Sequence, residues 1–315
     1  MKVIFMGTPE FAVPSLKAVV SANHEVAAVI TNRDEPQGRG LKIFPPAIKT
    51  AAVALGLPVI QVSNVKDSGF IAELKGLSPD VMVVVAFRIL PPEVFSIARL
   101  GTFNLHASLL PKYRGAAPIT WAIINGEQET GVTTFFLDEK VDTGKVILQK
   151  SIQIGEDETA GELSVRLSAL GGEAVVETLE RIQTGSLRLM KQDDSVSTKA
   201  PKISKEDCLI DWSKPARAVH NFIRGFSPEP GAYTFFGSKL VKIFRSSVFL
   251  PAKVDRQNTY PGTVNNSSGT LLVSCGEGWV EILELQLEGK KKLLAPDFLR
   301  GIRMVDGTQF KQTRG

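Results

Sequence analysis

Short apolar runs alternate with segments of helical periodicity through the first third of the chain, and this alternation limits the fold more than any other feature. The apolar runs are Lys2–Met6, Val26–Ile30, Val59–Ile60 and Val81–Ala86. The helical spacing lies between them, over Phe11–Val20, Pro46–Leu55 and Gly69–Gly76. A run that is apolar throughout, such as the fourth, is typical of a strand buried on both faces of a parallel sheet. The pattern predicts a doubly wound α/β sheet of Rossmann type, in which ligands bind beyond the carboxyl ends of the strands.

The last third of the chain has a different pattern, with short strands separated by glycine and asparagine turns. The expected strands are Ala232–Phe236, Leu240–Ser247, Gly262–Val264, Thr270–Cys275 and Trp279–Gln286. This spacing predicts a smaller, OB-like β-barrel. A polar segment, Met190–Lys205, precedes it and is interpreted as a linker. We therefore expect an α/β domain over 1–189, a linker over 190–205 and a β-barrel domain over 206–315, which suits a chain of 315 residues.

Basic residues are concentrated in the region of the expected barrel. Met1–Ala200 contains 20 Lys and Arg against 22 Asp and Glu, whereas Pro201–Gly315 contains 17 against 11. An excess of positive charge on one domain favours a polyanionic partner such as a nucleic acid. A basic surface that is merely well solvated would have the same composition.

Several classes of protein are excluded by what the sequence lacks. Its longest apolar run, Val81–Phe87, is too short to cross a bilayer, and its N-terminus has no signal-peptide layout, so we expect a cytosolic protein without membrane contact. Cys208 and Cys275 stand alone, which indicates neither a metal site nor a disulfide framework. After Gly7 the next glycine is Gly38, so the glycine loop of a nicotinamide dinucleotide site is missing.

The stretch from Gly101 to Pro118 contains the strongest candidates for chemistry. If it begins as a strand, Asn104 and His106 lie on one face, because side chains alternate. A carboxamide can donate to an oxygen that gains negative charge in acyl transfer, and an imidazole can move a proton. Asp142, in a turn further along, would favour the imidazolium if it lay near His106. The structural alternatives are a turn-capping Asn104, a buried His106 and a plain turn aspartate.

The segment NLHASLLPKYRGAAP, followed by LDEKVDTG, resembles the catalytic signature of the folate-dependent formyltransferases. The resemblance implies 10-formyltetrahydrofolate as the donor and catalytic roles for Asn104, His106 and Asp142, with no metal. The contacts with the folate donor that it implies are Phe87, Ile89, Leu90, Ser108, Leu109, Leu110, Pro111, Asp138 and Val141. The chain departs from the family at Phe87–Pro91, which is one residue shorter than the family's Tyr-Gly-x-x-x-Pro segment and lacks its glycine. Core packing is the alternative role for that segment.

The same resemblance implies that the acceptor is the α-amine of methionine on the initiator Met-tRNA. In the family members that act on this tRNA, a loop like Asn32–Lys42 enters its acceptor end, and Arg39 matches the loop's main arginine. Leu41 replaces a lysine there, and Lys42 is the basic residue beside it; a mobile surface loop is the alternative. Further phosphate contacts are expected from Lys290, Lys291, Lys292, Arg300 and Arg303. A small amine, glycinamide ribonucleotide or an amino sugar nucleotide, is the alternative acceptor, and an inactive RNA-binding protein is a third possibility. We expect a monomer.

Overall fold

The computed structural model describes residues 1–37, 42–249, 260–266, 269–302 and 304–314, and its contacts divide the chain into two compact units. Unit 1 comprises Met1–Pro118, Thr130–Ile152 and Ser164–Ala200. Unit 2 comprises Ile119–Glu129, Gln153–Leu163 and Pro201–Gly315. Two short internal segments thus pack with the C-terminal third. The domain boundaries expected from the sequence stay a prediction.

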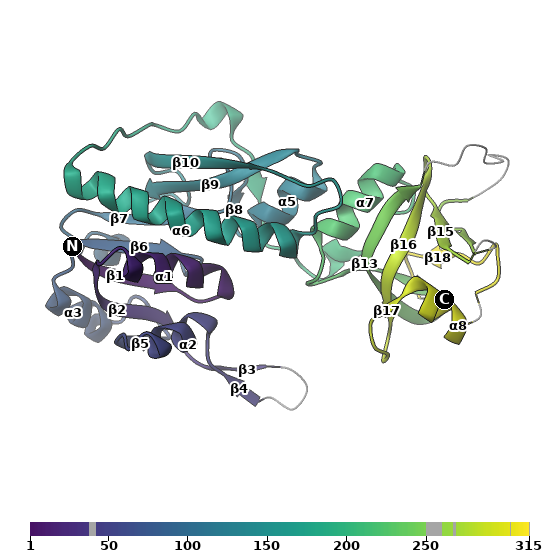
Figure 1. Ribbon diagram of the computed structural model, residues 1–315, viewed down its shortest axis with the longest axis horizontal. Coiled ribbons are helices and arrows are strands. Elements are labelled where there is room, and N and C mark those ends of the chain that lie inside the picture. Colours follow the sequence, from purple (N-terminus) through teal and green to yellow (C-terminus); the bar gives the residue numbers. More distant parts are fainter. Residues whose placement is uncertain (38–41, 250–259, 267–268, 303, 315) are drawn as a thin grey trace. The chain divides into compact units, whose positions relative to one another are not determined.

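Unit 1 is built on a seven-stranded sheet in the order β10-β9-β7-β6-β1-β2-β5 (Figure 1). The strands β1, β2, β5, β6 and β7 are parallel, whereas β9 runs antiparallel to β7. This confirms the predicted Rossmann-like sheet. The strands are β1 (Lys2–Gly7), β2 (Glu25–Asn32), β5 (Val59–Val62), β6 (Val81–Val85), β7 (Thr102–His106), β9 (Glu129–Phe136) and β10 (Val146–Gln153).

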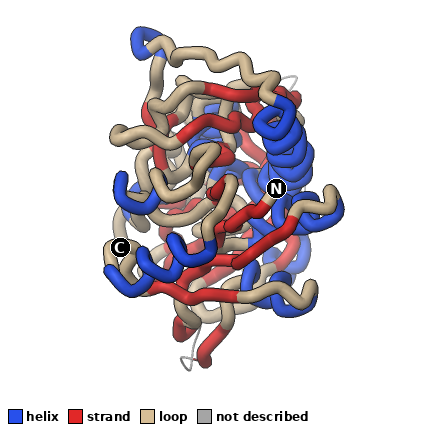
Figure 2. Tube along the Cα trace, turned by 90° about the vertical axis from the view of Figure 1, so that its left-hand side faces the viewer, coloured by secondary structure: helices blue, strands red, loops and turns tan. Residues whose placement is uncertain are grey.

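Helices connect the parallel strands and cover the sheet, because parallel neighbours need a crossover (Figure 2). The longest, α6, packs on the sheet through a hydrogen bond of 2.7 Å between the hydroxyls of Thr178 and Thr134. Its Gly172 lies against the backbone of Pro14 in α1, where a side chain would be crowded. The helices are α1 (Val13–Ser21), α2 (Ala47–Ala54), α3 (Ser68–Leu77), α4 (Pro92–Phe95) and α6 (Ala160–Thr184).

A short hairpin occupies the segment that the sequence indicated to be a loop. Strand β3 (Glu35–Gln37) pairs antiparallel with β4 (Lys42–Phe44). The pairing forms hydrogen bonds between backbone groups, and the two strands lack alternating apolar side chains. The sequence pattern therefore does not indicate a hairpin here. Arg39 lies outside the described residues, and so does the side chain of Lys42.

Unit 2 contains an antiparallel sheet in the order β14-β15-β16-β13-β12-β18, with β17 paired to β16. An isolated bridge between Thr263 and Gln309 joins the two ends of this order, so the sheet closes into a barrel and the predicted barrel is confirmed. Trp212, Ile223 and Phe298 are among the buried residues that fill it. The strands are β12 (Ala232–Phe236), β13 (Lys239–Phe249), β14 (Val264–Asn265), β15 (Leu271–Ser274), β16 (Trp279–Leu287), β17 (Leu293–Leu294) and β18 (Phe310–Lys311).

Helices α5 (Pro118–Ile124), α7 (Ala216–Gly225) and α8 (Ala295–Gly301) complete unit 2. On α7 the side chain of Arg224 is only 5% exposed. Its Nη1 donates to the carbonyls of Gly155 (3.1 Å) and Glu158 (2.9 Å), and its Nε donates to Asn221 Oδ1 (2.9 Å). These bonds fasten the 153–163 segment to α7.

The two cysteines, Cys208 and Cys275, are buried and unbridged. Burial raises the pKa of Cys208 to about 11 and that of Cys275 to about 12, so both thiols are protonated at neutral pH. In the described part of the chain, no helix has the length and apolar character that crossing a bilayer requires. The same residues contain no group of three or more His, Cys, Asp or Glu arranged to hold a metal ion.

Candidate active site

Strand β7 presents Asn104 and His106 on the same face, as the alternation of the sequence predicted. Between β6 and β9, Asn104 is paired with Val84 on one side and Phe135 on the other. The intervening Leu105 is 3% exposed and belongs to the opposite, buried face. The site therefore lies at the carboxyl end of a parallel strand, where ligands bind in this class of sheet.

The imidazole of His106 is oriented by a backbone carbonyl. Its Nε2 lies 2.9 Å from the oxygen of Tyr113, and because a carbonyl can only accept, Nε2 carries a hydrogen. In the neutral ring Nδ1 is then free of hydrogen and can accept a proton. Nδ1 lies 4.0 Å from Asp142 Oδ2, which is close enough to stabilise the imidazolium once it forms.

Asp142 is presented by a sharp turn after β9. Its φ of 58° is left-handed, an unusual conformation for a residue with a side chain. The carboxylate is 13% exposed, and its Oδ2 accepts a hydrogen bond of 2.9 Å from the amide of Gly115. The same oxygen therefore faces both His106 and a fixed backbone donor, which limits where the carboxylate can lie.

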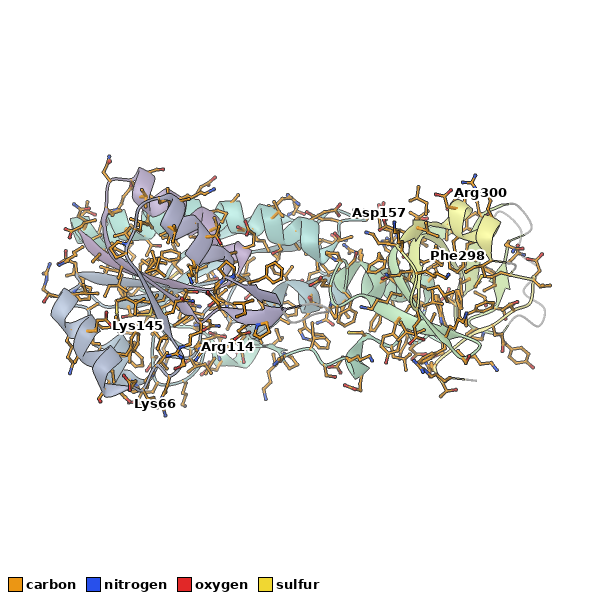
Figure 3. The ribbon with its side chains drawn as sticks, turned by 90° about the horizontal axis from the view of Figure 1, so that it is seen from below. Lys66, Arg114, Lys145, Asp157, Phe298 and Arg300 are labelled. Atoms are coloured by element: carbon orange, nitrogen blue, oxygen red, sulfur yellow. The ribbon has the colours of Figure 1, made fainter. Side chains whose placement is uncertain are left out.

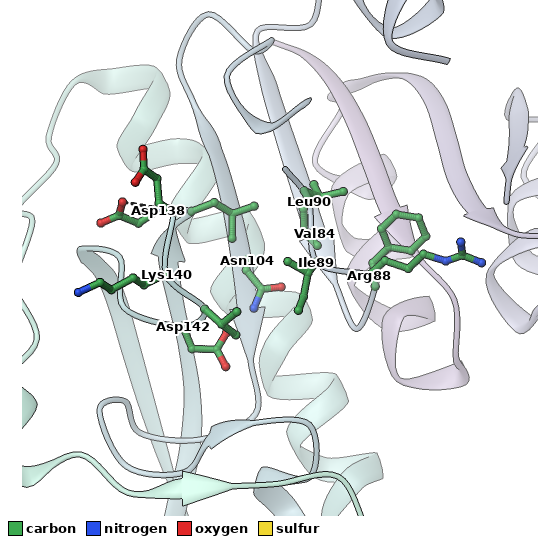
Figure 4. A pocket seen from close by; sticks show the side chains of 12 residues that line it. Val84, Arg88, Ile89, Leu90, Asn104, Asp138, Lys140 and Asp142 are labelled. Carbon is green, nitrogen blue, oxygen red and sulfur yellow. Dashed lines mark hydrogen bonds between the residues drawn. The ribbon is translucent and has the colours of Figure 1, made fainter. Parts of the chain in front are cut away.

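A pocket beside these groups contains Asn104 and Asp142 in its lining (Figure 4). The carboxamide of Asn104 lies between Ile89 and Asp142, and it has no hydrogen-bond partner among the described residues. It is thus available to a bound molecule. The lining consists of Val84, Phe87, Arg88, Ile89, Leu90, Asn104, Leu137, Asp138, Glu139, Lys140, Val141 and Asp142.

Five of the predicted folate contacts lie in this lining: Phe87, Ile89, Leu90, Asp138 and Val141. Ile89 and Val141 are large apolar residues that remain 74% and 52% exposed. Leu90, in contrast, is 6% exposed and packs in the core as well. The exposed pair presents apolar surface that a flat ring system could cover.

The other four predicted folate contacts, Ser108 to Pro111, do not line the pocket. The Ser108 hydroxyl donates to the carbonyl of Lys112 at 2.6 Å, and Leu110 is 4% exposed. The amide of Leu110 donates to Thr133 Oγ1 at 3.1 Å, and Gln149 donates to its carbonyl at 2.8 Å. These bonds shape the chain that leads to Tyr113. The contact of Ser108, Leu109, Leu110 and Pro111 with a folate stays a prediction.

Sequence reasoning missed several residues of the site. Arg88, in the shortened Phe87–Pro91 segment, lines the pocket, but its guanidinium points away from Asn104 (Figure 4). Its Nε donates to Asn32 Oδ1 at 2.7 Å, and it also bonds the carbonyl of Ser63. Arg88 therefore fastens the pocket wall to the ends of β2 and β5. The other residues missed are Val84, Tyr113, Gly115, Leu137, Glu139 and Lys140. Tyr113 and Gly115 act through backbone atoms, so no pattern of side chains could indicate their roles.

The predicted phosphate contacts of unit 2 are exposed where the structure describes them. Lys290, Lys291 and Lys292 lie in the turn between β16 and β17, and Lys292 pairs with Glu284 at 3.1 Å. Arg300 projects from α8 with 79% of its side chain exposed (Figure 3). Arg303 lies outside the described residues.

Comparison with known proteins agrees with this geometry. A family model described as formyl transferase matches residues 1–179, and one described as formyl transferase, C-terminal domain, matches residues 202–303. A methionyl-tRNA formyltransferase of Chlorobium phaeovibrioides is 51% identical over 313 residues, 98% of either chain. One of Chlorobium luteolum is 50% identical over 306 residues, 96% of this chain and 97% of that one.

A solved structure has the same fold. It is an N-formyltransferase of Helicobacter canadensis in complex with folinic acid and dTDP-3-aminofucose. The TM-score is 0.66 at 22% identity, over 93% of this chain and 100% of that one. The identity and coverage of the two Chlorobium proteins decide the family, and the chain belongs to the methionyl-tRNA formyltransferases.

Proposed function

We propose that this chain transfers a formyl group from 10-formyltetrahydrofolate to the α-amine of methionine on the initiator Met-tRNA. The observation that carries the proposal is the open carboxamide of Asn104 in a pocket that it shares with Asp142, the partner of His106. The names of the relatives, methionyl-tRNA formyltransferase, support the choice of reaction. The proposed catalytic residues are Asn104, His106 and Asp142.

The three side chains divide the work of an acyl transfer between them. The pKa of an unperturbed α-amine is about 7.7 to 8.0, so a useful fraction is already an unprotonated nucleophile at neutral pH. Asn104 donates a hydrogen bond to the oxygen that gains negative charge. His106 accepts the amine's proton at Nδ1, since Nε2 is bonded to Tyr113. Asp142, 4.0 Å away, stabilises the resulting cation. As the bond between the formyl carbon and N10 of the donor breaks, the proton on His106 would pass to N10, the leaving nitrogen.

The pocket suits a folate donor. Val84, Ile89 and Leu90 supply apolar walls, and Asn104 supplies an unpaired polar group at its base. When bound, 10-formyltetrahydrofolate supplies an activated formyl group. The exposed side chains of Ile89 and Val141 would exclude water from the reacting atoms once a ligand covers them.

The choice of a tRNA acceptor is supported by the basic residues of the chain. Pro201–Gly315 has six more basic than acidic residues, and Lys290–Lys292 and Arg300 are exposed. These cations, with Arg39, Lys42 and Arg303, are the proposed phosphate contacts. An enzyme that modifies the initiator tRNA works in the cytoplasm, and we propose that it does so as a monomer.

One assay separates the proposed acceptor from the alternatives. The protein is given 10-formyltetrahydrofolate with initiator Met-tRNA, glycinamide ribonucleotide or an amino sugar nucleotide. We expect turnover with the charged tRNA alone, and we expect its KM to rise steeply with salt, because phosphate contacts release counterions. Turnover with a small amine but not with the tRNA would overturn the proposed acceptor. Tight tRNA binding without turnover would overturn the enzymatic function.

A further inference from the structure

Gln192 is a buried glutamine, 7% exposed, in the segment that the sequence marked only as a linker. Its Nε2 donates to the carbonyl oxygens of Asp142 and Gly144, both at 2.9 Å. Its Oε1 accepts from Nε (3.1 Å) and Nη2 (2.7 Å) of Arg114. Because a carbonyl only accepts and a guanidinium only donates, these partners determine which way the amide points. Gln192 thus joins Arg114 to the turn that carries Asp142.

The turn at Asp142 needs such support. A left-handed backbone at a residue with a side chain is strained and persists only where its surroundings hold it. Gly144 is also confined, since a Cβ there would collide with the carbonyl oxygen of Phe136. Gln192 bonds the carbonyls on both sides of this confined backbone.

A pair of short strands holds the carboxylate of Asp142. Strand β8 (Arg114–Gly115) pairs in parallel with β11 (Lys199–Ala200), and the amide of Gly115 is the donor to Asp142 Oδ2. Arg114 is further paired with the exposed Asp194 at 2.8 Å. Backbone and side chain of Asp142 are therefore both bonded, one through Gln192 and the other through Gly115.

We propose that Gln192 is a positioning residue for the transfer reaction, which holds the carboxylate of Asp142 opposite Nδ1 of His106. The inference rests on the proposed function, which assigns His106 and Asp142 their roles. If Gln192 acted only on the stability of the fold, its loss would not change the rate constant of the folded enzyme.

The decisive variant is Gln192→Glu. It keeps the size of the side chain and an acceptor for Arg114, but it turns an oxygen toward the carbonyls of Asp142 and Gly144. We expect kcat to fall by about ten- to a hundredfold, because a displacement of about 1 Å costs on the order of a hundredfold. The KM values for both substrates should change by less than about threefold, since Gln192 is 7% exposed and does not line the pocket.

Nuclear magnetic resonance can follow the ring nitrogens of His106, whose signals would not change if Gln192 only stabilised the fold. The chain has only three histidines, so the ring nitrogens of His106 can be assigned. In Gln192→Glu we expect those signals to shift in the same direction as in Asp142→Asn.

Gln61 offers a matched control. Its Nε2 donates to the carbonyl of Asn32 at 2.9 Å and to Asp34 Oδ1 at 2.7 Å, and its Oε1 accepts from Lys49 at 2.8 Å. Like Gln192, it therefore has two acceptors on its nitrogen and a cation on its oxygen, in another part of unit 1. Gln61→Glu should leave the His106 signals unchanged. Should Gln192→Glu fail to fold, Arg114→Lys removes the two-pronged contact while keeping the charge, and a smaller fall in kcat is expected.

The outcomes separate the inference from the function on which it rests. A wild-type kcat and unshifted His106 signals in Gln192→Glu, with Asp142→Asn inactive, would overturn the role of Gln192 alone. Full activity in Asp142→Asn would overturn both. A fall in kcat with unchanged KM and shifted His106 signals, absent in Gln61→Glu, supports the inference.

Discussion

The two units each bury a histidine, and the two rings differ in how completely their nitrogens are bonded. His106 has one nitrogen on a backbone carbonyl, while the other, among the residues that the structure describes, has only a carboxylate at 4.0 Å, beyond hydrogen-bond distance. In His220, Nδ1 lies 3.1 Å from Ser246 Oγ, and Nε2 lies 3.3 Å from the Glu156 carbonyl and 3.2 Å from Asp157 Oδ1. Full bonding makes a buried ring part of the structure, whereas a free nitrogen near a pocket can move a proton.

The surroundings of His220 reinforce the contrast. Burial lowers the pKa of His220 from its ordinary value of 6.5, and the charge of Arg224 lowers it further against the opposing effect of the Glu156 carbonyl, so the ring is neutral at pH 7. Arg224 itself has three bonded acceptors. The polar groups of His220 and Arg224 in unit 2 are therefore bonded to the protein itself. In unit 1, the carboxamide of Asn104 is left for a ligand.

The largest effect on the reaction rate is expected from removing the unbonded carboxamide of Asn104. Asn104→Ala should lower the rate of the chemical step by about 10² to 10³, or roughly 3 to 4 kcal/mol of barrier, because one donor to the developing charge is lost. His106→Ala should lower it by about a hundredfold. Single-turnover rates measure this step, and circular dichroism should show an intact fold. Near-wild-type rates in both variants would contradict the catalytic assignment.

The next largest effect is expected from replacing Arg224, the buried arginine with three bonded acceptors. Arg224→Leu removes the guanidinium donor from the carbonyls of Gly155 and Glu158, although Gly155 keeps the amide of Glu158 at 3.2 Å, and the change should cost about 1 to 3 kcal/mol of unfolding free energy. Urea denaturation measures the change. Arg217→Leu, on the same helix, breaks only an exposed ion pair with Glu156 and should cost less than about 1 kcal/mol. Equal losses in the two variants would show that the buried contacts of Arg224 are unimportant.

A smaller effect is expected at the start of α6. Thr159 and Glu162 form a capping box: Glu162 Oε2 accepts from the Thr159 amide at 2.9 Å, and Thr159 Oγ1 accepts from the Glu162 amide at 3.3 Å. Thr159→Ala should lower the stability by about 1 kcal/mol without changing kcat. Thr184→Ala, at the exposed end of the same helix, is the control. A change in kcat would mean that unit 2 affects the chemistry.

The smallest expected effect concerns pH. Because the pKa of His220 is lowered on folding, its neutral form stabilises the protein above the ordinary value of 6.5, and this contribution is lost as the pH falls below it. Glu162 has a pKa of about 2, lowered first by the Thr159 amide and then by Arg245, so its own contribution is lost only below about 4.5. Burial also lowers the pKa of His24, so thermal unfolding between pH 7.5 and 5 should show a loss that is smaller, but not absent, in His220→Gln.

Much of the fold could be predicted because the pattern of apolar residues is local. The predicted helix Pro46–Leu55 and the observed α2 differ by one residue at each end, and the predicted strand Ala232–Phe236 matches β12. The hairpin β3–β4 was not predicted, since its backbone pairing leaves no apolar alternation. A barrel was predicted, but not that Thr263 and Gln309 close it, because these two residues lie far apart in the chain.

The site could be predicted where side chains carry the chemistry. Residue types and spacing made Asn104, His106 and Asp142 candidates, the resemblance to the formyltransferases implied their catalytic roles, and the structure brings Asp142 within 4.0 Å of His106. The supporting atoms escaped prediction. The carbonyl of Tyr113 and the amide of Gly115 belong to backbone that every residue possesses, so no residue type marks them.

By itself, the sequence determined which elements form and which side chains hold the reactive groups, because periodicity and residue chemistry are properties of neighbouring positions. Only the tertiary structure decided which nitrogen of His106 is free and which residue holds the turn of Asp142. Those answers depend on contacts between segments such as Arg114 and Gln192, 78 positions apart, and Gln192 and Asp142, 50 apart. A hydrogen bond between distant segments forms only when the fold brings a donor and an acceptor together, so no local pattern contains it.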